Sequence, residues 1–462
     1  MKRTRSRSLP VLIITLGFFV GIVYFVVNLV IHSAQWASMP QNAHLSDNSE
    51  LGSAGTITDR NGVVLAKSEN GRRVYNDDED VRKACLHVVG DDSVNISTAI
   101  QTLYRSELTG YDFIFGLGLP SELKKGKDIR LTIDSKIQKA AYNALGDNRG
   151  AVVVCNYKTG EILCMASTPT YDPMNKPEDI DSNEDYEGAY LNKAISAAYP
   201  PGSTFKLVTA ASALENFDDA ESREMECTGS DIIGGQEINC FEVSGWVDLR
   251  KALMESCNVY FAHTAVDLGK DKMTAQAKKM GFNRSWKFDG IETVKSRYDV
   301  SKATENELAW SGVGQYTVLE SPMNMALRTS AVANGGVSVK PMVVKNISLP
   351  MGLPAPDKSS SDGDRMMSKE VADKLADMMD YTVENYYGKS SFTDRLDICA
   401  KTGTAEVSEG GNDAHAWVTG FSKDKDCPIA FSVIVEHGNS GSGVAIPTAS
   451  TVLEVCADAF DK

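Results

Sequence analysis

Three short motifs that contain serine, lysine and asparagine follow one another along this chain. They are Pro200 to Lys206 (P-P-G-S-T-F-K), Ser256 to Asn258 (S-C-N) and Lys401 to Thr404 (K-T-G-T). A serine hydroxyl is a weak nucleophile at its own pKa, so a neighbouring base must accept its proton as it attacks. A lysine can be that base when burial or a nearby cation lowers its pKa. The motifs therefore predict acyl transfer through a serine that a lysine activates.

Each motif also has matches elsewhere in the chain, so order and surroundings decide which match carries chemistry. S-x-x-K recurs at Ser121 and Ser422, both in polar segments that offer nothing to bury a lysine. K-T-G recurs at Lys158, between two apolar β-runs, where we expect an exposed hairpin tip. Ser203 is the match that has both other motifs downstream of it.

The surroundings of Ser203 favour a buried helix. The break P-P-G lies directly before it, and the apolar stretch L-V-T-A-A-S-A-L follows Lys206. We expect Ser203 to open this helix and to share one face with Lys206. Lys401, in contrast, leaves the apolar strand D-I-C-A, and Gly403 would let a peptide lie close along the edge of that strand.

With these motifs and the segments around them, the chain resembles the class B penicillin-binding proteins, the peptidoglycan D,D-transpeptidases. The resemblance runs from about Gly55 to the C-terminus. Gly55 to Ala66 resembles the family's segment just outside the membrane. Ile129 to Ala140 and Ala166 to Pro173 resemble the beginning of the transpeptidase domain. His415 to Phe421 resembles the strand that follows K-T-G.

The resemblance implies an α+β fold of the penicillin-binding and serine β-lactamase type. Such a fold has an antiparallel sheet flanked by helices, here on a small N-terminal pedestal with one transmembrane helix. Two segments depart from the family pattern. Ala54-Gly55 stands where Arg-Gly is usual, and V-G-Q-Y (Val313 to Tyr316) stands where G-Q-G is common. The catalytic motifs are intact.

The resemblance also assigns catalytic roles. A stem peptide that ends in D-Ala-D-Ala would acylate Ser203, the last D-Ala would leave, and an amine from a neighbouring strand would take the acyl group. β-Lactam antibiotics would acylate the same serine. Lys206 is then the base toward Ser203, and Ser256, with Lys401, relays a proton to the leaving amine.

Four further residues are implied to bind the substrate. Asn258 positions the substrate amide, and Gly403 lets the substrate approach the strand. Thr402 and Thr404 hold the terminal carboxylate near the charge of the K-T-G lysine. Backbone N–H groups of Ser203 and Thr404 form the oxyanion hole.

Other functions remain open for the same motifs. A D,D-carboxypeptidase or a β-lactamase would share the fold, but the anchor and the pedestal favour a transpeptidase. We recognise no deacylating base in the sequence. A non-catalytic β-lactam sensor or scaffold is a further alternative, which the short N-terminal tail and the intact motifs disfavour.

The N-terminus predicts a membrane anchor. Four basic residues among the first seven precede a mostly apolar run from Val11 to Ile31, long enough to span a bilayer. The basic flank should stay in the cytoplasm, which leaves the catalytic domain on the extracytoplasmic side. A cleaved signal peptide is the alternative, but no clear A-x-A site follows the run.

We therefore expect five consecutive parts in the chain, and we expect residues 350–366 to be a flexible surface loop. The parts are a cytoplasmic tail (1–8), a transmembrane anchor (9–31), a stalk (32–52), a pedestal domain (53–127) and a transpeptidase domain (128–462).

Charge restricts the partners. The net charge is −15, and because residues 1–31 carry four positive charges and no negative ones, the remainder carries −19. An acidic surface disfavours nucleic acid as a partner. The resemblance implies peptidoglycan stem peptides, β-lactams and a membrane-embedded glycosyltransferase as partners.

Nine cysteines in an exported domain suggest a disulfide, although an odd number cannot all pair within one chain. Cys227 and Cys240 bracket an expected β-hairpin, which favours a bond between them. Four other cysteines lie in apolar runs and should be buried free thiols: Cys155, Cys164, Cys399 and Cys456. The six histidines are scattered and no C-x-x-C occurs, so we expect no metal and no cofactor.

Overall fold

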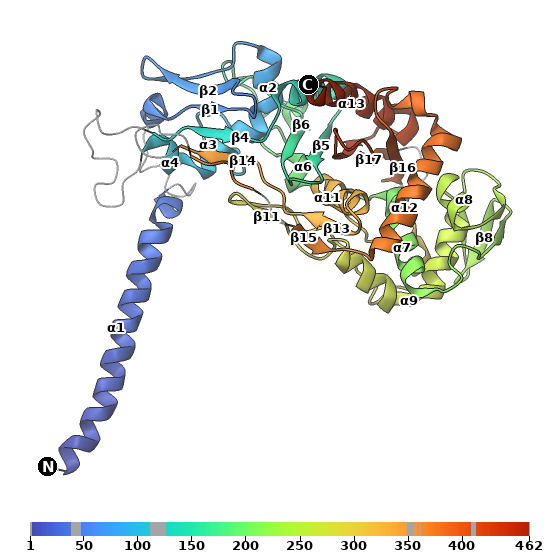
Figure 1. Cartoon of the computed structure of the whole chain (residues 1–462), viewed down its shortest axis with the longest axis horizontal. Coiled ribbons are helices and arrows are strands. Elements are labelled where there is room, and N and C mark those ends of the chain that lie inside the picture. Colours follow the sequence, from blue (N-terminus) through green and yellow to red (C-terminus); the bar gives the residue numbers. More distant parts are fainter. Residues whose placement is uncertain are drawn as a thin grey trace.

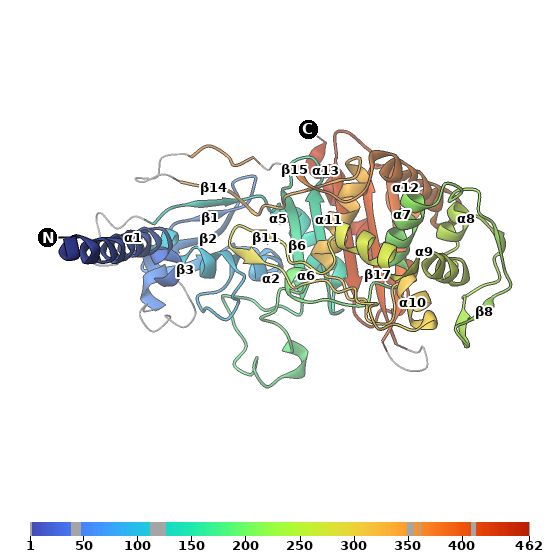
Figure 2. The same ribbon diagram turned by 90° about the horizontal axis from the view of Figure 1, so that it is seen from below.

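A long helix, a small sheet and a larger catalytic region follow one another in space (Figure 1). The computed structural model describes residues 2–37, 48–110, 126–348, 355–359, 362–407 and 413–461. The N-terminal helix α1 projects away from the rest, and the β8 hairpin lies at the opposite end of the molecule (Figures 1 and 2).

The catalytic region is built on a five-stranded antiparallel sheet in the order β16-β17-β18-β5-β6. Its strands are β5 (Gly150–Asn156), β6 (Ile162–Thr168), β16 (Ile398–Glu406), β17 (Ala414–Ser422) and β18 (Ile429–Val435). Every residue of β5, β6, β17 and β18 is buried. Strands that are buried throughout require cover on both faces of the sheet.

Helices supply that cover. Because side chains alternate along a strand, Val152 and Val154 point to one face of the sheet and Val153 and Cys155 to the other. The first pair belongs to a core formed with α5 (Ser135–Leu145) and α13 (Ile446–Phe460). The second pair belongs to the core of α11 (Pro322–Ala333) and the helices beyond it. The predicted α+β class is therefore confirmed.

A helical lobe extends beyond the second face. It contains α7 (Lys206–Asn216), α8 (Leu249–Met254), α9 (Asn258–Lys279), α10 (Glu305–Gly312) and α12 (Lys369–Thr382). Strands β8 (Ser230–Ile233) and β9 (Gln236–Asn239) form the expected hairpin, and β7 (Met225–Cys227) pairs with β10 (Gly245–Val247) beside it. Side-chain caps begin α8, α9, α10 and α12, as with Thr304 and Glu307 in the capping box of α10.

The pedestal has its own five-stranded sheet, in the order β14-β4-β1-β2-β3. The strands are β1 (Ile57–Thr58), β2 (Val64–Glu69), β3 (Arg72–Tyr75), β4 (Ile129–Leu131) and β14 (Val344–Ile347). Helices α2 (Glu79–Val89), α3 (Ile100–Leu103) and α4 (Arg105–Thr109) accompany it. The division into pedestal and transpeptidase domain at residue 128 stays a prediction, but this sheet takes strands from both sides of it.

Residues 350–366 differ from the predicted flexible loop at their C-terminal end. Strand β15 (Asp362–Arg365) pairs antiparallel with β13 (Val337–Val339), and Met366 is fully buried. The sequence D-G-D-R lacks the apolar alternation typical of a strand, but Gly363 lets the backbone lie directly against Ser338. The loop prediction is therefore wrong for 362–366, and residues 349–354 and 360–361 lie outside the described residues.

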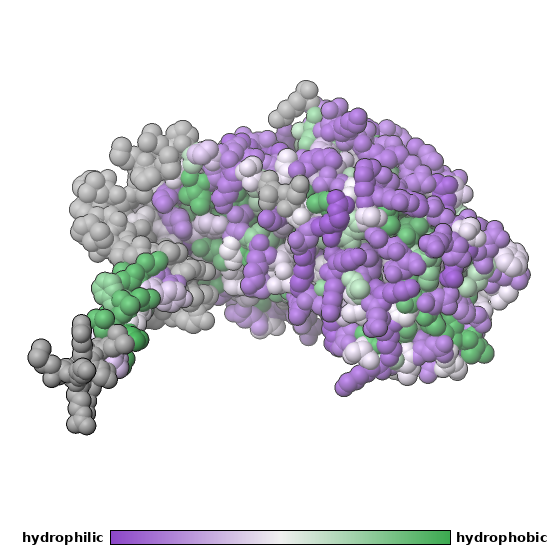
Figure 3. Space-filling model, turned by 60° about the horizontal axis from the view of Figure 1, so that its bottom comes forward, coloured by the Kyte–Doolittle hydropathy of each residue, from purple (hydrophilic) through white to green (hydrophobic). Residues whose placement is uncertain are grey.

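Helix α1 (Lys2–Ala37) contains an apolar stretch, Pro10–Leu29, with no residue of that stretch buried against the protein. It is the apolar green rod that projects from a largely hydrophilic body in Figure 3. Twenty helical residues span about 30 Å, the thickness of a bilayer core. Membrane insertion stays a prediction, and most of the predicted stalk (38–47) lies outside the described residues.

Candidate active site

Ser203 lies in a 3₁₀ turn, Gly202–Phe205, that leads directly into α7. Lys206, the first residue of α7, is fully buried and its Nζ donates a hydrogen bond to Ser203 Oγ at 3.1 Å. The two residues share one face because they are three positions apart on a continuous helical path. The base expected from the sequence is thus in contact with the expected nucleophile.

Lys206 also joins Ser203 to the S-C-N motif. Its Nζ donates to Asn258 Oδ1 at 2.7 Å and to Ser256 Oγ at 3.2 Å, and it contacts the carbonyl oxygen of Ser256. Burial, and then the charge of Lys401, hold the pKa of Lys206 well below its usual value. A lowered pKa favours the neutral amine, which is the form that can accept a proton.

Lys401 approaches the same group from the other side. Its Nζ donates to Ser256 Oγ at 3.1 Å and to the carbonyl oxygen of Thr402 at 3.0 Å. Burial lowers the pKa of Lys401 to about 7. Ser256 Oγ therefore touches two lysine amines, which makes a short path for a proton. The backbone of Ser256 is left-handed (φ +57°), a conformation that costs energy in a non-glycine residue and is common at functional sites.

Glycines let the Ser203 turn and strand β16 lie in direct contact. Gly202 has φ +52° and faces the carbonyl oxygen of Thr404 so closely that any side chain would collide with it. A Cβ at Gly403 would lie 2.7 Å from the carbonyl oxygen of Pro201. The P-P-G-S and K-T-G motifs therefore need their glycines to bring Ser203 beside the strand.

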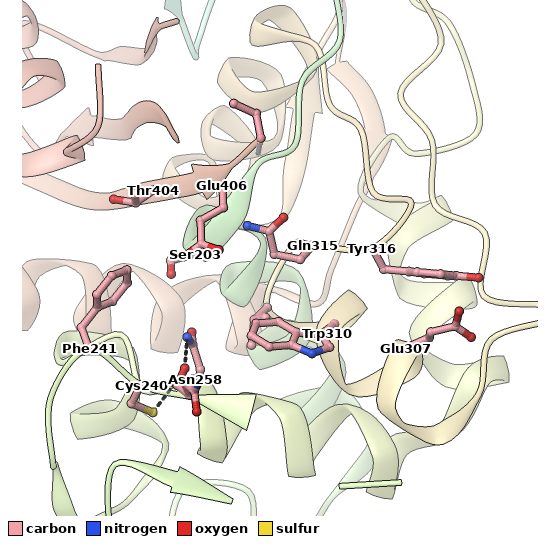
Figure 4. Close-up of a pocket in the computed structure, with 13 residues that line it drawn as sticks. Ser203, Cys240, Phe241, Asn258, Glu307, Trp310, Gln315, Tyr316, Thr404 and Glu406 are labelled. Carbon is pink, nitrogen blue, oxygen red and sulfur yellow. Dashed lines mark hydrogen bonds between the residues drawn. The ribbon is translucent and has the colours of Figure 1, made fainter. Parts of the chain in front are cut away.

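Ser203 stands where two cavities meet, each of about 620 Å³, and both also include Thr404. The first cavity contains Asn258, Trp310, Gln315, Tyr316 and Glu406 (Figure 4). The second contains Ser256, Tyr387, Thr402, Gly403 and Ser440. We call Lys401 to Thr404 the K-T-G wall, and Cys240 with Ser256 to Asn258 the S-C-N wall. The structure thus brings all eight predicted site residues together around one serine.

Comparison with known proteins identifies the family to which this site and fold belong. The profile of the penicillin-binding protein transpeptidase domain matches residues 150–454, more than half of the chain. The chain belongs to the penicillin-binding protein transpeptidase family.

Curated relatives of this transpeptidase are named for the same activity. The chain is 28% identical over 355 residues to the peptidoglycan D,D-transpeptidase PbpA of Mycolicibacterium smegmatis, which covers 70% of this chain and 71% of the relative. It is 26% identical over 355 residues to the peptidoglycan D,D-transpeptidase MrdA of Acinetobacter baumannii, covering 70% of this chain and 52% of the relative.

Solved structures of penicillin-binding proteins share the fold over most of both chains. Penicillin-binding protein A from Mycobacterium tuberculosis, solved as a penicillin G acyl-enzyme complex, has a TM-score of 0.75 at 26% identity and covers 87% of this chain and 99% of that one. The D,D-transpeptidase domain of a peptidoglycan glycosyltransferase from Eggerthella lenta has a TM-score of 0.77 at 30% identity and covers 88% and 99%. The class B assignment is therefore confirmed.

The transpeptidase site contains one contributor that the motifs did not reveal. Tyr387 ends a π-helical turn (Val383–Tyr387) after α12. Its hydroxyl lies 2.7 Å from Thr402 Oγ1, accepts from the Thr402 N–H at 3.0 Å and lies 3.5 Å from Lys401 Nζ. Nothing in the sequence around Tyr387 signals this contact, because it depends on how α12 packs on β16.

A buried ion pair supports the turn that contains Ser203. Arg328 on α11 and Glu320 are both fully buried, with Nη2 and Oε2 3.1 Å apart. Arg328 Nη1 donates to the carbonyl oxygen of Thr204, inside the Ser203 turn, at 3.1 Å. The backbone of Glu320 pairs with that of Tyr199, just before the P-P-G break. The pair therefore holds both ends of the segment that presents Ser203.

The decoy motifs lie away from the site. Lys158 is exposed at the predicted hairpin tip and bonds Asn334. Lys425 is exposed as well, although Ser422 itself is buried at the end of β17. Ser121 lies outside the described residues.

The predicted Cys227–Cys240 disulfide is not formed in the structure. Their Sγ atoms lie 3.6 Å apart, whereas a disulfide measures about 2.05 Å. Cys240 has a second sulfur neighbour, Cys257, at 3.8 Å. The hairpin brings the two predicted partners together, but a third thiol joins them. The four cysteines expected to be buried free thiols are so.

Proposed function

We propose that this protein is a peptidoglycan D,D-transpeptidase that forms an acyl-enzyme on Ser203. The observation that carries the proposal is the position of Ser203 between two cavities of similar size, since cross-linking needs one site for the donor peptide and another for the acceptor amine. Strand β16 is an edge strand of its sheet, so its outer edge is available to an extended peptide.

In the first step, Lys206 takes the proton of Ser203 as Oγ attacks the carbonyl carbon of the penultimate D-Ala. The lowered pKa of Lys206 keeps part of it neutral for this purpose. The bond to the last D-Ala then breaks, and its nitrogen receives a proton through Ser256 Oγ, which contacts both lysines. The product is an ester on Ser203 and a free D-Ala.

In the second step, an amine in the other cavity attacks the ester carbonyl. The amine loses a proton to the same lysine and serine groups, and Ser203 Oγ regains one as the new amide forms. Backbone N–H groups of Ser203 and Thr404 would stabilise the oxyanion, an effect worth roughly 3–4 kcal/mol per donor in other acyl-transfer enzymes.

The K-T-G and S-C-N walls would hold the donor peptide. Thr402 and Thr404 are half-buried along the cleft and would bind the terminal carboxylate beside Lys401. Asn258 Nδ2 uses one N–H on the carbonyl oxygen of Asn239, at 2.7 Å, which leaves its second N–H for a substrate carbonyl.

A hydrolase would need a base that activates water at the acyl-enzyme. Among the described residues no carboxylate is hydrogen-bonded to Ser203 or Lys206. This favours transfer to an amine over a β-lactamase or a D,D-carboxypeptidase.

We further propose that α1 anchors the protein in the cell membrane, with the catalytic region on the extracytoplasmic side. The apolar stretch of α1 and its basic N-terminal flank support this orientation. A membrane-embedded glycosyltransferase would supply the glycan strands that carry the donor and acceptor peptides.

The test uses the full chain in detergent with fluorescent penicillin and intact-mass analysis. Wild type should gain one penicilloyl group that persists for many minutes, and Ser203→Ala should gain none. Ser121→Ala, at one of the two other S-x-x-K matches, is the control and should label normally. Labelling of Ser203→Ala, or multiple turnover of a chromogenic cephalosporin by wild type, would contradict the proposal.

A further inference from the structure

Three cysteines from distant parts of the chain meet beside the nucleophile. Cys227 ends β7, Cys240 follows β9, and Cys257 is the central residue of S-C-N and the N-cap of α9. Cys240 Sγ lies 3.6 Å from Cys227 Sγ and 3.8 Å from Cys257 Sγ, and all three sulfur atoms lie within 4.8 Å of one another. No other cysteines of the described chain gather in this way.

These separations fit sulfur atoms that share one metal ion. Zinc–thiolate bonds are about 2.3 Å, so two sulfur ligands at a tetrahedral ion lie about 3.8 Å apart. A disulfide would instead require one pair to approach to about 2.05 Å and would leave the third cysteine unused. Two of the three sulfur separations already match this value, and the third is within 4.8 Å, so the three thiols fit the metal geometry with little movement.

Backbone N–H groups of α9 contact two of the three sulfur atoms. Cys240 Sγ accepts backbone N–H groups of Asn258 at 3.2 Å and Val259 at 3.3 Å, in the first turn of α9. Cys257 Sγ accepts the N–H of Tyr260 at 3.4 Å. Backbone donors of this kind stabilise thiolates when a metal ion is bound.

The group is closed on one side and open on the other. Cys227 and Cys257 are buried, whereas Cys240 is half-buried and lines the cavity that contains Ser203 (Figure 4). Within the described residues no histidine or carboxylate completes the set. A fourth coordination position would therefore face the cavity and could hold water or a small ligand.

We propose that Cys227, Cys240 and Cys257 form a binding site for a thiophilic d¹⁰ cation, Zn²⁺ being the ion that suits three thiolates and one open position. The ion clamps the S-C-N wall. Cys240 bonds the N–H of Asn258, and Cys257 lies between Ser256 and Asn258, so the ion fixes the groups that contact Lys206. This proposal does not depend on the reaction that Ser203 performs.

The first experiment measures zinc in the full chain, purified in detergent with a non-thiol reductant and then freed of unbound metal. Wild type should retain one equivalent of Zn²⁺, and Cys240→Ser should lose it. Cys427→Ser is the matched control, since Cys427 is buried in a different core and should keep the metal. Equal zinc in wild type and Cys240→Ser would overturn the proposal.

Two further measurements apply if Cys240→Ser loses zinc only because it fails to fold. Cys227→Ser removes a different ligand, and Cd²⁺ added to wild type should give a thiolate-to-metal charge-transfer absorption that both serine variants lack. Zn²⁺ should also raise the melting temperature of wild type and of Cys427→Ser, because it binds the folded state. Absence of the Cd²⁺ absorption in folded wild type would contradict the site.

A disulfide is the competing chemical state. Peptide mapping of protein taken from membranes without reductant distinguishes the two, because a metal site leaves all three thiols free to be alkylated after chelation. A bond from Cys240 to either neighbour would replace the metal site with a disulfide.

Discussion

The K-T-G wall and the S-C-N wall face the same serine, but different forces position them. The K-T-G residues lie in β16, which pairs with β17 without a break from Ile398 to Glu406. The S-C-N residues lie between short α8 and the first turn of α9, beside a hairpin that projects from the body. Backbone register fixes the first wall, and side-chain contacts fix the second.

Because of this difference, substitutions in the two walls should affect stability and activity to different extents. Lys401 lies in a strand whose position the sheet fixes. The main contribution of Lys401 to the free energy of folding is therefore the unfavourable burial of its amine. Asn258 and Ser256 depend on hydrogen bonds to Lys206 and on the sulfur contacts of Cys240 and Cys257. Removal of the buried Lys401 amine should therefore be visible in the stability of the fold, whereas changes at the S-C-N wall should appear mainly in the rate of acylation.

The largest expected effect separates the two lysines. Arginine keeps a positive charge and cannot act as a neutral base, so Lys206→Arg should slow acylation by penicillin by about 10²–10⁴-fold. Lys401→Arg keeps a positive charge beside the carboxylate of the bound penicillin, so it should slow acylation less than Lys206→Arg does. Intact-mass kinetics measure both rates. A wild-type rate in Lys206→Arg would remove its role as the base.

The next effect concerns the turn that lies between the two walls. Glu320→Gln leaves the charge of Arg328 buried without its partner, which typically costs about 3–5 kcal/mol. We expect a lower free energy of unfolding in urea and slower acylation, because Arg328 holds the turn at Thr204. Glu292→Gln, on an exposed ion pair, is the control and should change neither. An unchanged stability in Glu320→Gln would show that the ion pair is dispensable.

A third prediction tests the cost of burying Lys401. Its folded pKa is about 7 and its ordinary value is 10.5, so between these pH values the unfolded chain binds a proton that the folded one does not. The free energy of unfolding should therefore rise with pH across this range, by at most about 1.4 kcal/mol per pH unit from this group. Urea unfolding at several pH values should show a shallower slope in Lys401→Met. Part of the slope should remain in Lys401→Met, because the pKa of Lys206 is also lowered in the folded state. Parallel pH dependences of wild type and variant would contradict the prediction.

The smallest effect concerns Tyr387. Tyr387→Phe removes the hydroxyl that bonds Thr402 and approaches Lys401, a loss of about 0.5–1.5 kcal/mol for one hydrogen bond. We expect a few-fold weaker initial binding of penicillin with little change in the later acylation rate constant. Tyr386→Phe, on the exposed neighbour, is the control. Similar kinetics in the two variants would mean that Tyr387 only packs against the wall.

The structure brings the predicted site residues together, and the sequence could indicate them because each motif is short and carries its own chemistry. Ser203 and Lys206 are three residues apart, and K-T-G follows an apolar strand, so local patterns are enough. The alternating pattern also predicts the hairpins at Lys158 and between Cys227 and Cys240.

Contacts between distant segments could not be predicted from the sequence. Tyr387, Arg328 and Glu320 reach the site through helix packing, which leaves no local pattern. Strand β15 is polar and owes its pairing to Gly363 lying against β13. The cysteine cluster escapes the usual metal motifs because its members are separated by 12 and 16 intervening residues.

The pedestal sheet has a mechanical consequence. Strand β4 lies between β1 and β14, parallel to one and antiparallel to the other, and β14 returns to it from more than 200 residues further along the chain. A hinge at residue 128 would have to break the backbone hydrogen bonds between β1 and β4, because β4 and β14 both lie on its C-terminal side. Tension applied through α1 should therefore reach the catalytic region through the β1–β4 hydrogen bonds as well as through the chain, and removal of residues 53–127 would leave β4 paired with β14 alone.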